Sequence, residues 1–208
     1  MKTILIHPTY FPSIVQMAAI IQADNVVFEV SGNYQKQSYR SRAYIAHSNG
    51  KLMLSIPVKH SGDGNNITTK EVQVENAFPW QNQHWKSLES AYRTSPYFEF
   101  YEDDLKPLFF NKETSLLEFN LKVFDLICEL LEIKIPYSFT KEYMKSPTQI
   151  DLRFLANSKL KKEYSLESYF QVLGSNYDFL PNLSILDLLF NEGTNTIQYL
   201  ESQKLDFF

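Results

Sequence analysis

The sequence predicts an α/β fold, with a Rossmann-like N-terminal βαβ sheet and a mainly helical C-terminal half packed on it. Residues Thr3–Ile6 and Asn25–Val30 are apolar runs of strand length, and Ser13–Ala23 between them has the length and pattern of a buried helix. Strand, helix and strand within about 30 residues are typical of a βαβ unit. Helical periodicity dominates the rest of the chain, which predicts the second half.

We expect a single domain over residues 1–208, with the α/β sheet portion in 1–76 and the mainly helical portion in 77–208. Hydrophobic residues make up 44% of the chain and aromatic residues 15%, a composition that favours a packed core over disorder. We see no internal repeat or linker.

The composition also excludes several partners and compartments. A net charge of -4 argues against a nucleic-acid-binding module, whose surface is usually basic. The single cysteine, Cys128, excludes an intramolecular disulfide. The apolar run Ile14–Ile21 is too short to span a bilayer and lacks a signal-peptide cleavage site. We therefore expect a cytoplasmic protein without membrane insertion.

The elements of the α/β portion have local signals. Ile4-Leu5-Ile6 is continuously apolar, as in a parallel sheet. Ser13 is a candidate N-cap for the helix, and Pro12 is the alternative as a first-turn residue. Farther on, Lys51–Val58 reads as a strand after a tight hairpin turn at Asn49-Gly50.

Two further segments complete this portion. Lys59–Asn66, with the sequence KHSGDGNN, predicts a flexible loop. Thr69–Glu75 alternates polar and apolar residues and predicts another strand.

Three helices are predicted in the second half, over Trp80–Thr94, Ser115–Leu131 and Leu183–Phe190. The last has Asn182 or Ser184 as its cap and Gly193 as its stop. The middle one has a polar stripe of Glu118, Lys122, Asp125 and Glu129, and its apolar stripe includes Cys128, which is therefore expected to be unreactive.

The loop His7–Pro12 is the first candidate site. In parallel α/β sheets, ligands bind at the carboxyl ends of strands, beside helix N-termini whose N–H groups favour anions. His7 follows the first strand and would reach a phosphate or carboxylate, with Tyr10 and Phe11 forming one wall. The alternative is that both aromatics pack in the core and His7 is a structural histidine.

The segment Lys36–Arg42 is the second candidate. If it is extended, Lys36, Ser38, Arg40 and Arg42 share one face, and the three cations suit a phosphate or nucleotide. Tyr39 lies beside them as a candidate for substrate contact or proton transfer. The alternative is a solvated edge strand, which basic residues protect from aggregation.

Four other polar residues are either candidates for the site or structural residues. His84 shares a helical face with Leu88 and Ala91, so it is either a catalytic residue or a buried, hydrogen-bonded histidine. The polar residues Gln16, Glu29 and Asn33 lie near the expected ligand edge of the sheet, and Glu29 needs a partner if it is buried.

No metal site is expected. The four histidines, His7, His47, His60 and His84, lack zinc-site spacing, and the acidic run Glu102–Asp104 reads as a solvated helix face. No glycine-rich phosphate-loop or dinucleotide fingerprint is present. The cofactor is therefore unknown, with a nucleotide as the candidate.

Several motifs, in this order, resemble the WbqC-like family of bacterial proteins. They are HPTYFP, NYQKQSYRSR, IPV, SAYRTSPYFEFYEDD and NLSILDLLFNEG, and they cover nearly the whole chain. The resemblance implies a cytoplasmic role in making or decorating activated sugars for surface polysaccharides such as O-antigen. The family looks distantly similar to the nucleotidylyltransferase-like α/β fold, in which a histidine-bearing loop contacts nucleotide phosphates, a part that His7 would take.

These observations lead to three functional hypotheses. The first is a transferase acting on a phosphorylated or nucleotide-linked small molecule, a small anionic ligand that Lys36, Arg40 and Arg42 would neutralise. The second is a non-catalytic binding or assembly protein, whose many aromatics face a partner. The third is acyl or aminoacyl transfer to a sugar. A polar pocket at the His7 loop favours an enzyme, whereas a large apolar patch away from it favours the second hypothesis.

Overall fold

The computed structural model describes residues 1–59, 67–160, 162–175 and 178–208. Most of the predicted loop Lys59–Asn66, including His60, lies outside the described residues. In the described part, the strands are β1 (Thr3–Ile6), β2 (Asn25–Phe28), β3 (Arg42–His47), β4 (Gly50–Ser55), β5 (Tyr137–Phe139) and β6 (Ile150–Asp151). The α-helices are α1 (Ile14–Ile21), α2 (Trp80–Tyr92), α3 (Phe98–Leu105), α4 (Pro107–Phe110), α5 (Leu116–Leu130), α6 (Ile185–Glu192) and α7 (Thr196–Ser202).

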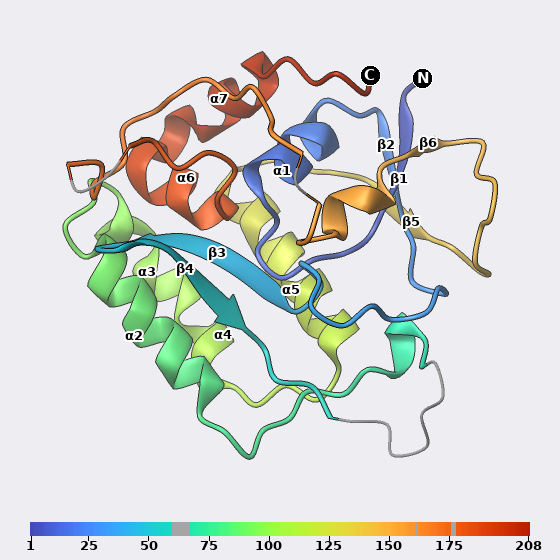
Figure 1. Ribbon diagram of the computed structural model, residues 1–208, viewed down its shortest axis with the longest axis horizontal. Coiled ribbons are helices and arrows are strands. Elements are labelled where there is room, and N and C mark those ends of the chain that lie inside the picture. Colours follow the sequence, from blue (N-terminus) through green and yellow to red (C-terminus); the bar gives the residue numbers. More distant parts are fainter. Residues whose placement is uncertain (60–66, 161, 176–177) are drawn as a thin grey trace.

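A four-stranded parallel sheet with the order β5-β2-β1-β6 organises the fold (Figure 1). β1 lies inside this sheet, and the side chains of Ile4, Leu5 and Ile6 are fully buried, which explains their continuous apolar pattern. The chain runs outward from β1 to β2 to β5 and then places β6 on the other side of β1. The predicted α/β class and the βαβ unit are confirmed.

The sheet also contains strands that were not predicted. β5 and β6 come from the second half of the chain, and β6 pairs only Ile150 with Ile4 and Asp151 with Leu5. The backbone N–H of Leu152 extends this pairing by donating to Leu5. The portion 77–208, although mainly helical, thus completes the sheet that the first portion begins.

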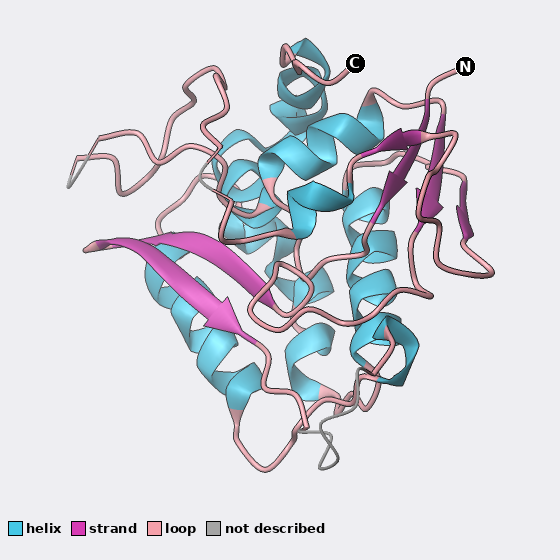
Figure 2. Ribbon diagram, turned by 45° about the vertical axis from the view of Figure 1, so that its right-hand side comes forward, coloured by secondary structure: helices cyan, strands magenta, loops and turns pink. Residues whose placement is uncertain are grey.

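β3 and β4 form a separate antiparallel hairpin with Ser48 and Asn49 in its turn. Gly50 begins β4 with a φ of 103°, a conformation that favours glycine. The predicted hairpin turn is therefore confirmed, but it lies at Ser48-Asn49, one residue before the predicted Asn49-Gly50. Figure 2 shows the parallel sheet and the hairpin on opposite sides of the molecule with helices between them. Apolar residues from both portions of the chain join in one hydrophobic core.

The strand predicted over Thr69–Glu75 is wrong. Thr69–Glu71 is a 3₁₀ turn that begins with a capping box, in which the Glu71 carboxylate accepts hydrogen bonds from the backbone and hydroxyl of Thr68. Only isolated bridges follow, from Gln73 to Ser115 and from Val74 to Val58. The alternating pattern thus reflects the buried side chains of Val72 and Val74, without the continuous hydrogen bonding of a β-strand.

The predicted helices are present with their expected caps. Ser13 caps α1, and Ser184 caps α6 by accepting a hydrogen bond from the backbone of Leu186. In α5 the polar stripe is exposed, and Cys128 is buried, which raises the pKa of its thiol to about 12. Among the described residues, no helix combines the length and the apolar character needed to cross a membrane.

Gly193 at the end of α6 should tolerate no side chain. Its φ is 54°, and a β-carbon there would lie 2.5 Å from the Tyr97 ring. We expect Gly193→Ala to lower the free energy of unfolding by roughly 2 kcal/mol, measured by urea denaturation. Gly50→Ala is the matched control, because Gly50 also has a positive φ but no atom within 4 Å of an added β-carbon. Equal losses in both variants would contradict the steric argument.

Candidate functional site

The carboxyl ends of all four parallel strands meet at one edge of the sheet. His7 follows β1, Glu29 follows β2, Thr140 follows β5, and Asp151 ends β6. β2 and β5 are added on one side of β1 and β6 on the other, so a topological switch point lies between β1 and β6, where open α/β sheets bind ligands. The topology therefore places the candidate site beside His7 and Asp151.

A cavity of about 630 Å³ opens at this edge, within the size range of small-molecule sites. Most of its lining residues are polar or charged, and the aromatic residues Tyr143 and Phe154 also line it. The charged and aromatic side chains that line this cavity, together with His7, are those of Arg40, Asp151, Arg153, Tyr143 and Phe154.

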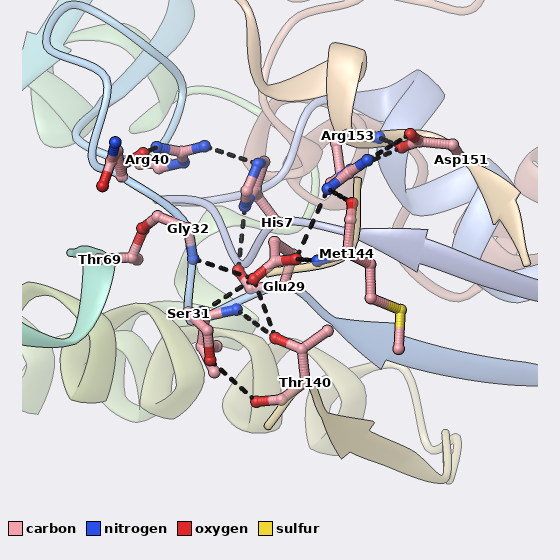
Figure 3. Close-up of polar contacts among 12 residues, drawn as sticks. His7, Glu29, Ser31, Gly32, Arg40, Thr69, Thr140, Met144, Asp151 and Arg153 are labelled. Atoms are coloured by element: carbon pink, nitrogen blue, oxygen red, sulfur yellow. Dashed lines mark hydrogen bonds and ion pairs between the residues drawn. The ribbon is translucent and has the colours of Figure 1, made fainter. Parts of the chain in front are cut away.

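Glu29 supports the cavity from below (Figure 3). Its side chain is fully buried, and Oε1 accepts hydrogen bonds from the backbone of Ser31 at 2.8 Å and Gly32 at 3.0 Å, and from the Thr140 hydroxyl at 2.9 Å. Oε2 lies 3.5 Å from Nη1 of Arg153. A buried Glu29 was expected to need a partner, and its carboxylate has several. These contacts join the end of β2 to the residues that follow β5 and β6.

His7 is held as a neutral imidazole between two groups. Its Nδ1 lies 3.0 Å from the backbone oxygen of Glu29, and its Nε2 lies 2.6 Å from Nη2 of Arg40. Because a carbonyl oxygen only accepts and a guanidinium only donates, Nδ1 carries the proton and Nε2 accepts. Burial, and secondarily the charge of Arg40, lowers the pKa of His7 to about 3.

Arg40 is a buried cation without a carboxylate partner among the described residues. Arg40 is only 4% exposed, and besides the contact with His7 its Nη1 donates a hydrogen bond to the backbone oxygen of Asn33 at 3.1 Å. Its buried Nε has no hydrogen-bond partner in the described part of the chain. Burial lowers the pKa of Arg40 to about 10, so the fold holds this charge at a cost.

Arg153, in contrast, is fully paired. Its Nε and Nη2 donate to the two Asp151 oxygens at 2.8 and 2.6 Å, and Nη1 donates to the backbone oxygen of Met144 at 2.7 Å. Hydrogen bonding to Arg153 lowers the pKa of Asp151, which keeps this carboxylate charged. Arg153 therefore pairs with Asp151 and lies near Glu29, whereas Arg40 has no carboxylate within ion-pair distance among the described residues.

Comparisons with known proteins agree with the motifs noted in the sequence. The model of the WbqC-like protein family matches residues 7–165. The chain belongs to this family. Among curated proteins, an uncharacterized protein of Mycobacterium tuberculosis, Rv1507c, is 25% identical, over 96% of this chain and 97% of the relative. No solved structure matches the chain. The similarity to the nucleotidylyltransferase-like fold stays a prediction.

The segment matched by the WbqC-like family contains the whole candidate site. It begins at His7, directly after β1, and includes Arg40, β6 with Asp151, and Arg153. Helices α6 and α7 lie beyond it.

Tyr10 and Phe11 of this WbqC-like chain do not form a wall of the cavity, which corrects the expectation. Both side chains are buried in the core, where Tyr10 packs on Phe11 and Phe119, and Phe11 stacks on Phe109. Phe11 has a φ of 42°, which turns the chain after His7. The alternative reading of these two aromatics, as core residues, is confirmed.

His84 also lies in the core, outside the described lining of the cavity. Its Nδ1 is 2.9 Å from the Tyr10 hydroxyl, and its ring lies near Trp80. Burial lowers the pKa of His84 to about 4, which favours the neutral form. The structure therefore places His84 in the alternative role, that of a buried and hydrogen-bonded histidine.

Gln16 holds the loop rather than facing the cavity. Its Nε2 donates to the backbone oxygen of His7 at 2.9 Å, and its Oε1 accepts from the Thr9 hydroxyl at 3.0 Å. Both hydrogen bonds are buried, so Gln16 fixes where the loop leaves β1.

The N-terminus of α1 is closed to an anion, contrary to expectation. The backbone N–H of Ile14 donates to Leu183, that of Val15 to the Asn182 side chain, and that of Gln16 to the Ser13 hydroxyl. Because the chain before α6 satisfies the first two groups and the N-cap Ser13 the third, these three N–H groups are not free to bind an anion.

The segment Lys36–Arg42 is not extended, so the condition for a shared cationic face is not met. It consists of turns, and Gln37 adopts a φ of 58°, so alternate residues do not share a face. Lys36 is exposed, and Arg42 starts β3 opposite Ser55. Of the three cations, only Arg40 is among the described residues that line the cavity.

Sequence reasoning missed Asp151 and Arg153, which belong to or follow the two-residue strand β6, and Tyr143, which lies in the loop between β5 and β6. The run QIDLRF does alternate around Asp151 and Arg153, which was the available signal. In the described part of the chain, no cluster of His, Cys, Asp and Glu suits a metal ion.

Proposed function

We propose that this protein is a transferase that binds the phosphate of a phosphorylated or nucleotide-linked small molecule at Arg40, in surface polysaccharide biosynthesis. The single observation that carries the proposal is the buried guanidinium of Arg40. It lines a polar cavity at the switch point of the sheet, without a carboxylate partner among the described residues. A phosphate would supply a negative charge in direct contact with Arg40 and acceptors for its remaining N–H groups.

His7 acts in this proposal as a positioning residue. Its lone pair at Nε2 faces Arg40, so it orients the guanidinium toward the cavity and is not free to abstract a proton. The neutral state of His7 also leaves the charge of Arg40 undiminished for an incoming anion.

The location of the cavity favours a ligand-processing role over a purely structural one. A polar pocket beside the His7 loop is the feature that separates an enzyme from an assembly protein. Acyl transfer stays open as a variant of the same proposal, because an acyl adenylate also carries a phosphate that Arg40 would hold.

Ligand titration tests the proposal directly. Inorganic pyrophosphate, nucleoside mono- and diphosphates, nucleotide-sugars and acyl-adenylate analogues are added while thermal unfolding is followed. A ligand well above its dissociation constant should stabilise the wild-type protein by about 1–3 kcal/mol, which corresponds to about 2–4 °C per kcal/mol for a chain of this size.

Arg40 variants identify the site. Arg40→Ala should weaken binding by about 10- to 100-fold, since hydrogen bonds to a charged group are lost. Arg40→Lys keeps the charge but lacks the planar fork, so it should bind with intermediate affinity. Lys36→Ala, which removes the same charge from an exposed neighbour, is the matched control. Stabilisation that survives in a folded Arg40→Ala variant, or no response to any of these compounds, would refute the proposal.

A further inference from the structure

A second cavity, of about 410 Å³, lies next to the first. Tyr39, Lys51, Tyr164 and Asn182 line it, and none of these residues lines the first cavity. Phe154 and Asn157 line both, so the 3₁₀ turn Arg153–Ala156 and the residue after it form a shared wall.

Tyr39 and Arg40, consecutive in sequence, face different cavities. The backbone N–H of Tyr39 donates to Ala156 at 2.9 Å, and its carbonyl accepts from Tyr10 at 2.9 Å. These hydrogen bonds fix the chain at the shared wall, so Arg40 lines one side and Tyr39 the other. A ligand held at Arg40 therefore lies close to the second cavity.

The two cavities differ in chemistry. In the second, Lys162 is paired with Asp206 at 3.0 Å, and Lys51 donates to the backbone oxygen of Pro181 at 3.1 Å. The hydroxyls of Tyr39 and Tyr164 have no hydrogen-bond partner among the described residues. The first cavity thus offers the Arg40 guanidinium without a carboxylate partner among the described residues, and the second offers tyrosine hydroxyls beside the charged side chains of Lys51, Lys162 and Glu163.

We infer that the second cavity binds the carbohydrate part of a nucleotide-linked ligand whose phosphates Arg40 holds. The inference rests on the proposed function. Sugar rings present apolar C–H faces that pack on aromatic rings, and hydroxyls that pair with neutral donors and acceptors. Tyr39, Tyr164 and Phe154 supply the aromatic walls, and the amide of Asn157 lies where the two parts of the ligand join.

Paired titrations test this inference. Dissociation constants are measured by calorimetry for UDP and UDP-N-acetylglucosamine, GDP and GDP-mannose, and dTDP and dTDP-glucose. In the wild-type protein, at least one nucleotide-sugar should bind about 10-fold more tightly than its diphosphate. Tyr39→Phe should reduce this ratio about 3- to 10-fold, the effect of one hydrogen bond, and leave the affinity for the diphosphate unchanged.

The control is Tyr44→Phe. Tyr44 packs edge-on against the Tyr39 ring at 5.9 Å but is not among the described residues of either cavity, so its variant should keep the wild-type ratio. Free glucose and N-acetylglucosamine, followed by ligand-observed NMR, give a second readout that should weaken in Tyr39→Phe.

The outcomes separate the two proposals. If Arg40→Ala weakens diphosphate binding but Tyr39→Phe changes neither the ratio nor the free-sugar signal, the second cavity is not a carbohydrate site and the proposed function stands. If Arg40→Ala leaves diphosphate affinity unchanged, or no pair binds, the proposed function fails. Carbohydrate binding that depends on Tyr39 without Arg40 would support the second cavity alone.

Discussion

Acidification should destabilise this protein strongly, starting near pH 6.5. Burial lowers the pKa of His7 to about 3 and that of His84 to about 4, from an ordinary value of 6.5. The unfolded chain therefore binds more protons than the folded one below pH 6.5. The stability held by these two neutral histidines is fully present above pH 6.5 and is lost as the pH falls toward 3–4.

The expected magnitude is large. At about 1.4 kcal/mol per pKa unit, His7 accounts for roughly 4–5 kcal/mol and His84 for roughly 3 kcal/mol over that pH range. Most domains have only 5–15 kcal/mol to lose, so the chain should unfold near pH 4.

Urea denaturation between pH 7.5 and 4.5 measures the effect. With two histidines that titrate only in the unfolded chain, the free energy of unfolding should fall by roughly 2–3 kcal/mol per pH unit around pH 5–6. His7→Asn and His84→Asn should each remove about half of this slope. A stability that stays flat between pH 7 and 5, or a slope that neither substitution changes, would contradict the prediction.

Glu29→Ala should be among the most destabilising single substitutions in the chain. The buried carboxylate accepts hydrogen bonds from Ser31, Gly32 and Thr140 and faces Arg153. Removing it leaves these donors unpaired and takes a counter-charge from Arg153, so we expect a loss of roughly 3–5 kcal/mol. Urea denaturation at pH 7.5 measures this loss.

Two further variants sharpen the test. Glu29→Gln keeps an acceptor for the three donors at Oε1 but places an amide near Arg153, so its loss should be smaller, roughly 1–3 kcal/mol. Glu102→Ala is the surface control, because Glu102 pairs with the exposed Arg93 at 3.2 Å, and it should cost at most about 1 kcal/mol. If Glu29→Ala costs no more than Glu102→Ala, the network does not support the sheet edge.

The first strand, helix and strand were predictable because each is long or apolar enough to be specified locally. Ile4-Leu5-Ile6 are continuously apolar since their side chains are buried on both faces of the sheet, and Ser13 caps α1 as its residue type predicts. β5 and β6, with three and two residues, are too short for a recognisable period, and long-range pairing alone defines them.

The candidate site was predictable in part for the same reason. His7 and Arg40 belong to notable local motifs, and each lines the cavity. Their direct contact spans 33 positions in the sequence, and positive φ angles at Phe11 and Gln37 redirect the chain before it forms. Those turns sent Tyr10 into the core and separated Lys36 from Arg40, which a regular strand would have kept together.

The N-termini of α1 and α6 are hydrogen-bonded to each other, and this pairing limits where the chain can be truncated. Ser13 and Ser184 form a β-bridge, Ile14 donates to Leu183, and Ile185 donates to Pro12, so each helix closes the other's first turn. The segment that defines the family ends at residue 165. A fragment cut there would expose the apolar surface and the first amides of α1, directly behind the His7 loop. An expression boundary chosen to keep the candidate site intact should therefore retain residues through α7.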